Sequence, residues 1–387
     1  MPTKDKVFKV LMFGPNRVGK SSVLASMVDQ LEKVKKKTGG EITLTPSEAA
    51  KKLLNNKKDM LKNIFDELKD RVEENHVIDV EPTRAPVSYD FTLSVNGVEG
   101  TYDISFIDIN GEMLKDLDSS VRKKVVDLMY ESSVIIIAID TPHLMECNGQ
   151  YNEPVNSVNQ VMNLFHICNR EIYEQPKLVL FVPIKCEKYY HEKKMDEVNK
   201  RIKEKYRNVI SLFAKPSSKD KYMVAITPIL TLGDIVFDDF KRDENGDVVC
   251  IQRKAIVDEE ENIVGYENEF FKKRPVAAFY KFYGDNPAFS PEFCEQPLLY
   301  SLNFIMKLAE VKKKPSTKKP DQKKKSGLQK AFEFTFKAFY FPFYLAYELY
   351  TLHKEMQEAV KTVAAEVKTE GDGYEIIQNP FEVEVKK

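Results

Sequence analysis

Residues 14–21 read G-P-N-R-V-G-K-S, a complete match to the phosphate-binding pattern G-x-x-x-x-G-K-[ST]. The match follows an apolar run at residues 7–13 and opens a helical pattern, which predicts a strand, a tight loop and a helix. Glycines let such a loop curl until its N–H groups point at phosphate oxygens, and the helix N-terminus favours the same anion. A chance glycine-rich turn is the alternative, and this context disfavours it. The residues expected to bind phosphate are Gly14, Asn16, Arg17, Val18, Gly19, Lys20, Ser21 and Ser22.

Apolar runs alternate with helical patterns along residues 1–311, which predicts an α/β domain around a mostly parallel, six-stranded sheet of the Ras-like P-loop NTPase type. The expected strands are residues 7–13, 87–95, 103–108, 134–140, 178–184 and 222–226. The expected helices are residues 20–32, 113–130, 155–173, 195–213 and 297–311. Two insertions enlarge the domain: a mainly helical one at about 34–80 and one with β-hairpins at 234–282.

The C-terminal part of the chain has a different composition. Residues 312–327 form a lysine-rich linker with no apolar face to bury, and residues 328–387 are expected to form an aromatic helical extension with a flexible tail. Charged residues within the aromatic segment, such as Glu333 and Glu348, argue against a membrane span. We expect this segment to dock on the domain or on a second subunit. The alternative is attachment of the polybasic and aromatic residues to an anionic membrane surface.

Charge and cysteine usage narrow the function classes. The formal net charge is −1, so bulk charge gives no reason to expect a nucleic-acid partner. The five cysteines are odd in number and contain no C-x-x-C pair, which is typical of reduced thiols and makes a zinc site unexpected. The strand of the phosphate loop occupies the N-terminus, so no secretory signal is expected there. These features predict a cytoplasmic protein. If the polybasic and aromatic residues attach to a membrane surface, the protein would be peripheral to that membrane.

A magnesium site is expected beside the phosphate loop. Asp108-Ile109-Asn110-Gly111 ends the strand at 103–108, in the order and at the distance expected after a phosphate loop. Lys20 would bring its charge to the β- and γ-phosphates, while the Ser21 hydroxyl and the Asp108 carboxylate would hold Mg²⁺. The Gly111 N–H could reach the γ-phosphate and sense its loss. The alternative for this tetrapeptide is a plain turn.

The sequence that follows the strand at 178–184 predicts a base-reading loop. Guanine-specific loops usually read N-K-x-D, and here Lys185 and Glu187 occupy the second and fourth places, with Ile184 in the first. The lysine stem would lie over the base, and the acid would accept from the guanine N1–H and 2-amino group, a donor pair that adenine lacks. The longer Glu187 side chain changes the geometry but keeps the donor–acceptor pairing. An ordinary charged loop is the alternative.

In this order and spacing, the phosphate loop, Pro82-Thr83, D-x-x-G and K-x-E resemble a translation-factor-related (TRAFAC) small GTPase domain. The segments V-P-I-K-C-E-K-Y and T-P-I-L-T-L-G resemble, more narrowly, the bacterial double-GTPase group. The resemblance covers about residues 5–310 and implies GTP and GDP as ligands with Mg²⁺. It implies a second guanine-contacting turn at Thr227. It also implies that Thr83 ligates the metal, although a plain turn threonine is the alternative.

Two departures from Ras-like enzymes concern hydrolysis. Glu112 occupies the place of a water-orienting glutamine, where a carboxylate adds like charge near the γ-phosphate and would slow the reaction. Arg17 lies inside the phosphate loop, where atlastin-like GTPases carry an internal arginine finger; a solvent-facing arginine is the alternative. We therefore expect a GTPase switch activated by self-association or by a partner GTPase. A nucleotide-gated scaffold with little hydrolysis, and a P-loop ATPase or kinase, are the competing interpretations.

Overall fold

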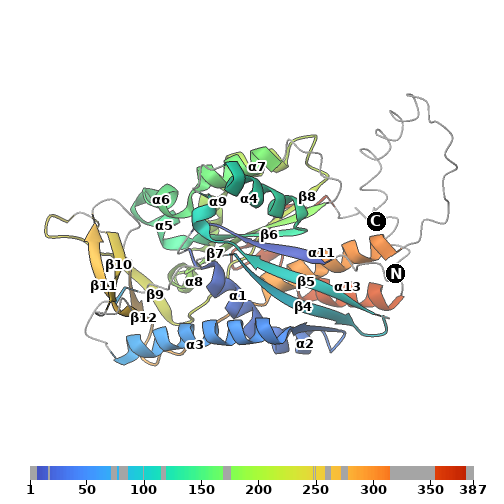
Figure 1. Cartoon of the computed structure of the whole chain (residues 1–387), viewed down its shortest axis with the longest axis horizontal. Helices are drawn as coiled ribbons and strands as arrows, with labels where there is room; N and C mark the ends of the chain where they lie inside the picture. Colours follow the sequence, from blue (N-terminus) through green and yellow to red (C-terminus); the bar gives the residue numbers. More distant parts are fainter. Residues whose placement is uncertain are drawn as a thin grey trace.

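The computed structural model describes residues 7–15, 18–70, 76–77, 86–98, 100–114, 119–168, 176–246, 248, 250–257, 263–271, 278–313 and 354–380. A nine-stranded sheet runs through the molecule in the order β13-β14-β8-β7-β6-β1-β5-β4-β2 (Figure 1). Its strands are β1 (Phe8–Phe13), β2 (Ile42–Pro46), β4 (Val87–Val95), β5 (Thr101–Asp108), β6 (Val134–Asp140), β7 (Lys177–Ile184), β8 (Tyr222–Ile226), β13 (Glu370–Gly371) and β14 (Tyr374–Gln378).

The centre of the sheet is parallel. β1 pairs with β5 on one side and with β6 on the other, and β6, β7 and β8 continue in the same direction. Every residue of β6, β7 and β8 is buried, as expected for strands that are covered on both faces. Because the carboxyl ends of parallel strands meet at one edge, the loops after β1, β5, β6, β7 and β8 are neighbours there.

Helices cover both faces of the sheet, and alternate side chains of β1 point to each. Val10 and Met12 belong to the core shared with α1, α2, α3, α11 and α13. Leu11 and Phe13 belong to the core shared with α4, α7, α9 and α10. The bounds of these helices are α1 (Lys20–Asp29), α2 (Leu31–Lys37), α3 (Glu48–Asp70), α4 (Ser119–Glu131), α7 (Val158–Cys168), α9 (Met195–Lys205), α10 (Arg207–Phe213), α11 (Gln296–Lys313) and α13 (Lys354–Glu366).

Short helical turns fill the loops between these elements. They are η1 (Gly111–Leu114), α5 (Thr141–Met145), η2 (Glu146–Gly149), α6 (Asn152–Asn156) and α8 (Glu187–His191). The helix predicted over residues 195–213 is present but is divided at Tyr206 into α9 and α10.

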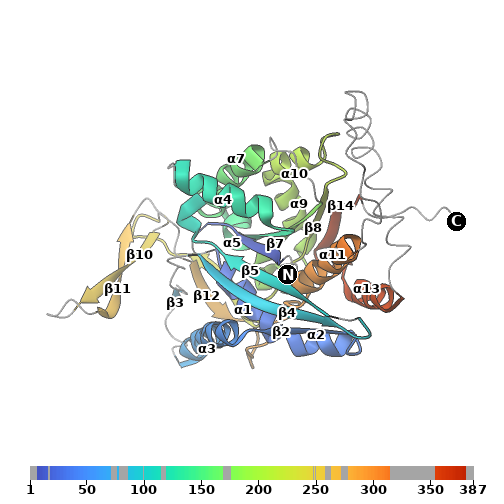
Figure 2. The same ribbon diagram turned by 45° about the vertical axis from the view of Figure 1, so that its right-hand side comes forward.

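A second β-structure extends from one end of the molecule (Figures 1 and 2). β9 (Ile235–Phe240) and β12 (Ala278–Phe282) pair antiparallel, and β3 (His76–Val77) adds to β12. Between β9 and β12 the chain makes the projecting hairpin of β10 (Cys250–Val257) and β11 (Ile263–Phe271). Side chains of β9 and β12 share a small core with Leu61 and Phe65 of α3, so the two segments predicted as insertions meet here.

The predicted count of six strands is wrong because short antiparallel strands extend both edges of the sheet. β2 pairs with β4 at one edge, and β14 pairs with β8 at the other. Within the segment predicted as a helical extension with a flexible tail, the structure describes residues 354–380. α13 packs against α11, and β13 and β14 lie in the predicted tail. Residues 374–378, which fall in the predicted tail, thus form an edge strand beside β8, whose residues are all buried.

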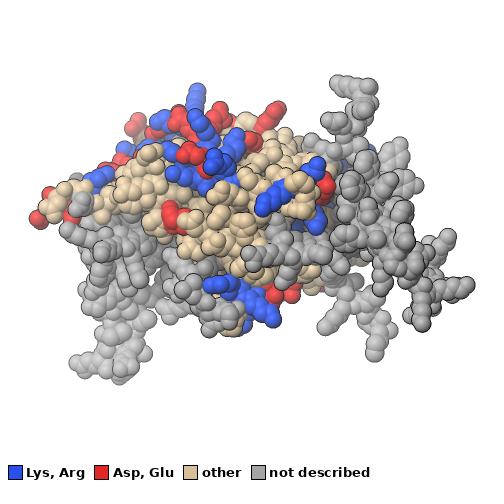
Figure 3. All heavy atoms as spheres, turned by 90° about the horizontal axis from the view of Figure 1, so that it is seen from above, with Lys and Arg blue, Asp and Glu red and all other residues tan. Residues whose placement is uncertain are grey.

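The lysine-rich linker beyond α11 and most of the aromatic segment lie in residues 314–353, outside the described residues. Among the residues that are described, no helix has the length and apolarity to cross a membrane. Figure 3 shows Lys and Arg side chains interspersed with Asp and Glu on the face seen from above. The described part of that face therefore carries both signs of charge rather than one extended patch.

Candidate nucleotide-binding site

The phosphate loop joins β1 to α1 at the carboxyl edge of the sheet. Gly14 and Val18 are buried, and Gly19 precedes the first residue of α1 with φ 102°. A Cβ on Gly19 would come within 2.6 Å of the Ile184 side chain, so only glycine fits where the loop passes the end of β7. Ser22 is partly exposed in the first turn of α1. The close approach of Gly19 to Ile184 places the phosphate loop directly beside the predicted base-reading loop.

Lys20 is a buried cation in the phosphate loop. Its side chain is 6% exposed, and its Nζ donates to the Pro15 carbonyl over 2.9 Å. Burial lowers the pKa of Lys20 to about 8, although the nearby Asp108 carboxylate acts in the opposite direction. The ammonium group thus lies inside the loop, where a bound anion would stabilise its charge.

Ser21 and Asp108 meet at the start of α1. The Ser21 Oγ donates to Asp108 Oδ2 over 2.5 Å, and Asp108 is fully buried at the end of β5. The parallel pairing of β1 and β5 sets Asp108 opposite Met12, one residue before the end of β1. A hydroxyl and a carboxylate side by side are a donor set that suits Mg²⁺, which usually takes one or two protein oxygens, phosphate oxygens and water. The residues present therefore fit the predicted metal.

The other residues predicted for the phosphate and metal region are only partly described. Gly111 is buried at the start of η1, three residues beyond Asp108. The Glu112 backbone belongs to η1, but its side chain lies outside the description. Asn16, Arg17 and Thr83 lie outside the described residues. Their roles stay predictions.

Lys185 lies at the end of β7 in a left-handed backbone conformation, with φ 55°. Its Nζ contacts Asp140 Oδ2 at 2.6 Å. Asp140 in turn caps α5 by accepting from the His143 backbone N–H, and its Oδ1 lies 2.5 Å from His143 Nδ1. Burial alone would raise the pKa of Asp140, but His143 and Lys185 outweigh it and hold that pKa well below its usual range. The lysine therefore joins the ends of β6 and β7.

Glu187 is buried, with 2% exposure, in the first turn of α8. Its Oε1 accepts from the backbone N–H of Thr231 at 2.9 Å and of Leu232 at 3.2 Å. Burial raises the pKa of Glu187 to about 7, while those backbone bonds and the Lys185 charge act against the shift. The carboxylate thus connects the loop after β7 to the loop after β8. Its predicted role as the guanine reader stays a prediction.

Thr227 follows β8 at the same edge and is fully buried. Its backbone N–H donates to the Phe181 carbonyl over 2.9 Å. Its hydroxyl has no hydrogen-bond partner among the described residues. A buried hydroxyl without a partner costs free energy unless a ligand or water satisfies it.

Sequence reasoning missed Asp140 and His143. Asp140 ends β6 in the same way as Asp108 ends β5, with an acid after an apolar strand, and that pattern was available in the sequence. The Asp140 backbone is fixed further by the Asn156 side chain, which both accepts from its N–H at 2.8 Å and donates to its carbonyl at 3.1 Å. His143 lies three residues after Asp140 in the turn that Asp140 caps, but Asn156 and Lys185 come from other segments, and the fold brings them to Asp140.

Comparisons with known proteins add little to this geometry. The chain matches no family model, and no curated protein matches it. Among solved structures, a similar one is the GTPase-like domain of Ski7 from S. cerevisiae, bound to GTP. The two are 10% identical with a TM-score of 0.28, and the match covers 73% of this chain and 72% of the other. A likeness this distant carries no argument, so the resemblance to the double-GTPase group stays a prediction.

Proposed function

We propose that the protein binds GTP with Mg²⁺ and hydrolyses it to GDP and phosphate as a molecular switch. The observation that supports this most is the convergence of a buried lysine, a serine hydroxyl and a strand-end carboxylate around one glycine-rich loop. Lys20 lies inside that loop, and Ser21 and Asp108 share a hydrogen bond of 2.5 Å. This arrangement suits a polyphosphate with its metal.

Each residue has a defined task in the proposed reaction. The N–H groups at the start of α1 and the Lys20 ammonium bind the β- and γ-phosphates. Ser21 and Asp108 would hold Mg²⁺, joined by Thr83, and the bound metal would neutralise charge on the phosphate oxygens. The Gly111 N–H senses the γ-phosphate. Arg17 and Glu112 act on the transition state and on the attacking water, in an arrangement that self-association or a partner GTPase completes.

Guanine selectivity rests on the loops after β7 and β8, through Lys185, Glu187 and Thr227. One observation favours a second candidate, a P-loop protein that does not distinguish guanine from adenine. The Glu187 Oε1 is already engaged by two backbone N–H groups, so that oxygen is not presented to a base. Competition between nucleotides decides between the two candidates.

The test is displacement of a fluorescent GDP analogue. GTP should displace it and ATP should not, whereas equal displacement by ATP would support the second candidate. Phosphate release from GTP separates a switch from a scaffold with little hydrolysis. Lys20→Ala should abolish binding because it removes the charge inside the loop.

Lys177 supplies a matched control for Lys20. It is also a buried lysine whose pKa burial lowers to about 8, but it lies at the amino end of β7, where its Nζ donates to the Tyr130 and Ser132 carbonyls. Lys177→Met should lower stability and leave nucleotide affinity unchanged. Full binding by Lys20→Ala would show that this loop is not the site.

A further inference from the structure

The loop at residues 227–232 is held in place by residues from other segments. It follows β8 and carries Thr227, the residue of the second predicted base contact. The Ile229 N–H donates to the Pro183 carbonyl at 3.2 Å, and Glu187 accepts from Thr231 and Leu232. Leu230 and Glu292 exchange two backbone hydrogen bonds, of 3.0 and 2.9 Å. The position of the loop therefore depends on what holds these partners.

The C-terminal segment contacts the same loop directly. The Tyr374 hydroxyl, at the start of β14, donates to the Pro228 carbonyl over 3.2 Å, and Tyr374 is 3% exposed. The turn before β14 packs closely against Met195 and Pro228. A Cβ on Gly373 would come within 3.0 Å of the Met195 Cβ and 3.3 Å of the Pro228 ring. Gly373 has φ +86°. Glycine thus permits both the turn and the close approach to Pro228.

β14 is itself fixed to the edge of the sheet. Its backbone pairs antiparallel with β8, and the Gln378 side chain donates to the Tyr222 carbonyl at 2.8 Å and the Lys219 carbonyl at 2.9 Å. Glu375 pairs with Lys203 of α9 at 2.8 Å. These contacts hold Tyr374 in register beside Pro228.

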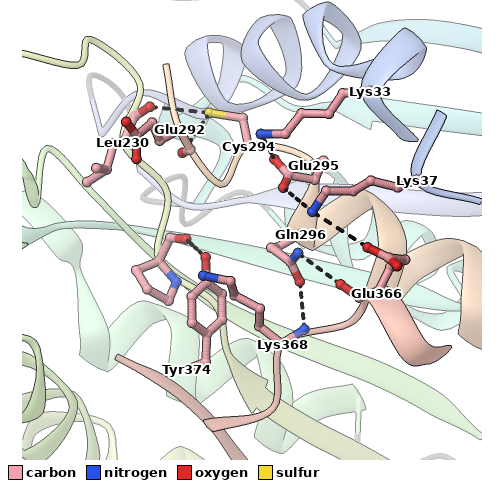
Figure 4. Close-up of polar contacts among 11 residues, drawn as sticks. Lys33, Lys37, Leu230, Glu292, Cys294, Glu295, Gln296, Glu366, Lys368 and Tyr374 are labelled. Carbon is pink, nitrogen blue, oxygen red and sulfur yellow. Dashed lines mark hydrogen bonds and ion pairs between the residues drawn. The ribbon is translucent and has the colours of Figure 1, made fainter. Parts of the chain in front are cut away.

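The other end of the segment is attached beside α2, whose Lys37 points toward Glu366 in Figure 4. Gln296 accepts from the Lys368 N–H at 2.8 Å and donates to the Glu366 carbonyl at 3.1 Å. Lys37 of α2 lies 3.0 Å from the buried Glu295 and 3.8 Å from Glu366. Since α2 follows α1 directly, the segment connects the helices after the phosphate loop with the loop after β8.

We propose that the C-terminal segment positions the nucleotide site through Tyr374, which holds the 227–232 loop in the arrangement that a base meets. The inference rests on the proposed function and adds a segment of the chain that influences the affinity of the site for the nucleotide. Tyr374 is a positioning residue that acts through Pro228. Because coupling between two sites is reciprocal, a nucleotide bound at the loop stabilises the attachment of β14 by the same factor.

The test compares Tyr374→Phe with Tyr300→Phe in the full chain. Tyr300 is the matched control, since it is also buried and its hydroxyl donates to the same segment, at the Lys368 carbonyl over 2.7 Å. Tyr374→Phe should raise the Kd for GDP about 5-fold, which corresponds to ~1 kcal/mol for one neutral hydrogen bond. Tyr300→Phe should leave that Kd unchanged. The melting temperatures of the two variants should fall by similar amounts.

Hydrogen exchange gives a second readout that general destabilisation does not mimic. GDP should slow exchange at the amides of residues 374–378 in the wild type and in Tyr300→Phe, and less so in Tyr374→Phe. Equal Kd values for both variants, or no GDP effect on exchange in β14, would overturn the inference while leaving GDP binding intact. A wild type that binds no GDP would overturn the proposed function, and the inference with it.

Discussion

Lys20 shows how burial prepares a side chain for an anionic ligand. Its ammonium group has left water for the interior of the phosphate loop, where a carbonyl and the Asp108 carboxylate offset only part of the lost hydration. The result is a pKa lowered to about 8. A polyphosphate bound in the loop would supply the missing negative charge and raise that pKa again.

We therefore predict that nucleotide affinity falls as pH rises above about 8. The free protein loses the Lys20 proton near that pH, while the complex keeps it, so binding must take up a proton and Kd should rise up to about tenfold per pH unit. The measurement is GDP titration from about pH 7 to about pH 9.5. In Lys20→Arg the guanidinium stays charged, and the slope should vanish. An unchanged slope in that variant would assign the effect to another group.

At the scale of elements, the apolar runs predicted the central strands because strands covered on both faces read as continuous apolar sequence. The short edge strands were missed. β14 follows the turn Gly371-Asp372-Gly373, a usable signal, but its partner β8 lies far earlier in the chain. Motif spacing predicted the meeting of Lys20, Ser21 and Asp108 at one edge. The pairing of Lys185 with Asp140, and of Glu187 with the next loop, depends on the three-dimensional arrangement of loops that have no shared pattern in the sequence.

Glu187 links α8 to the loop after β8, and this link has a pH-dependent cost. Its pKa is raised from 4.5 to about 7, so the folded state binds the proton more tightly than the unfolded state. The contribution of Glu187 to the free energy of unfolding should therefore fall as pH rises from about 4.5 to about 7, and should then stay constant. Above that pH the buried Glu187 carboxylate is charged, and its lost hydration lowers the stability of the folded state.

Glu187→Gln tests this because the amide oxygen can still accept from Thr231 and Leu232. We predict that the stability of the variant does not fall over that pH window. Above about pH 7, its free energy of unfolding should be up to about 3 kcal/mol higher than that of the wild type. The measurement is urea unfolding at a series of pH values. Parallel pH profiles for the wild type and Glu187→Gln would mean that Glu187 is not the titrating group.

At the scale of the whole molecule, the edge strands of the sheet come from distant parts of the chain. The segment after α1 supplies β2, and the C-terminus supplies β14 beside β8. The hairpin of β10 and β11 projects from one end (Figure 2), beyond the small sheet of β3, β12 and β9. The candidate site lies on the edge where the parallel strands end. The phosphate loop near the N-terminus forms one part of it, and Tyr374 near the C-terminus contacts the loop after β8.

The last prediction concerns hydrolysis and assembly. Glu112 takes the place of a water-orienting glutamine, so the isolated chain should turn over slowly, and Arg17 lies in the phosphate loop, where it could stabilise the transition state. An arginine finger contributes ~10³–10⁵-fold in rate. If Arg17 is that finger, Arg17→Ala should bind GTP almost as tightly as the wild type and hydrolyse it far more slowly. If a second copy completes the site, turnover per molecule should also rise with protein concentration.

Phosphate release across a concentration series, for the wild type and for Arg17→Ala, separates these contributions. A rising profile for the wild type and a flat, slow one for the variant is the result expected from self-association. A flat profile in which only the variant is slow would indicate an arginine already in place or a different partner. Equal and concentration-independent rates would leave Arg17 as a solvent-facing residue, because a group that touches the transition state cannot be removed without changing the rate.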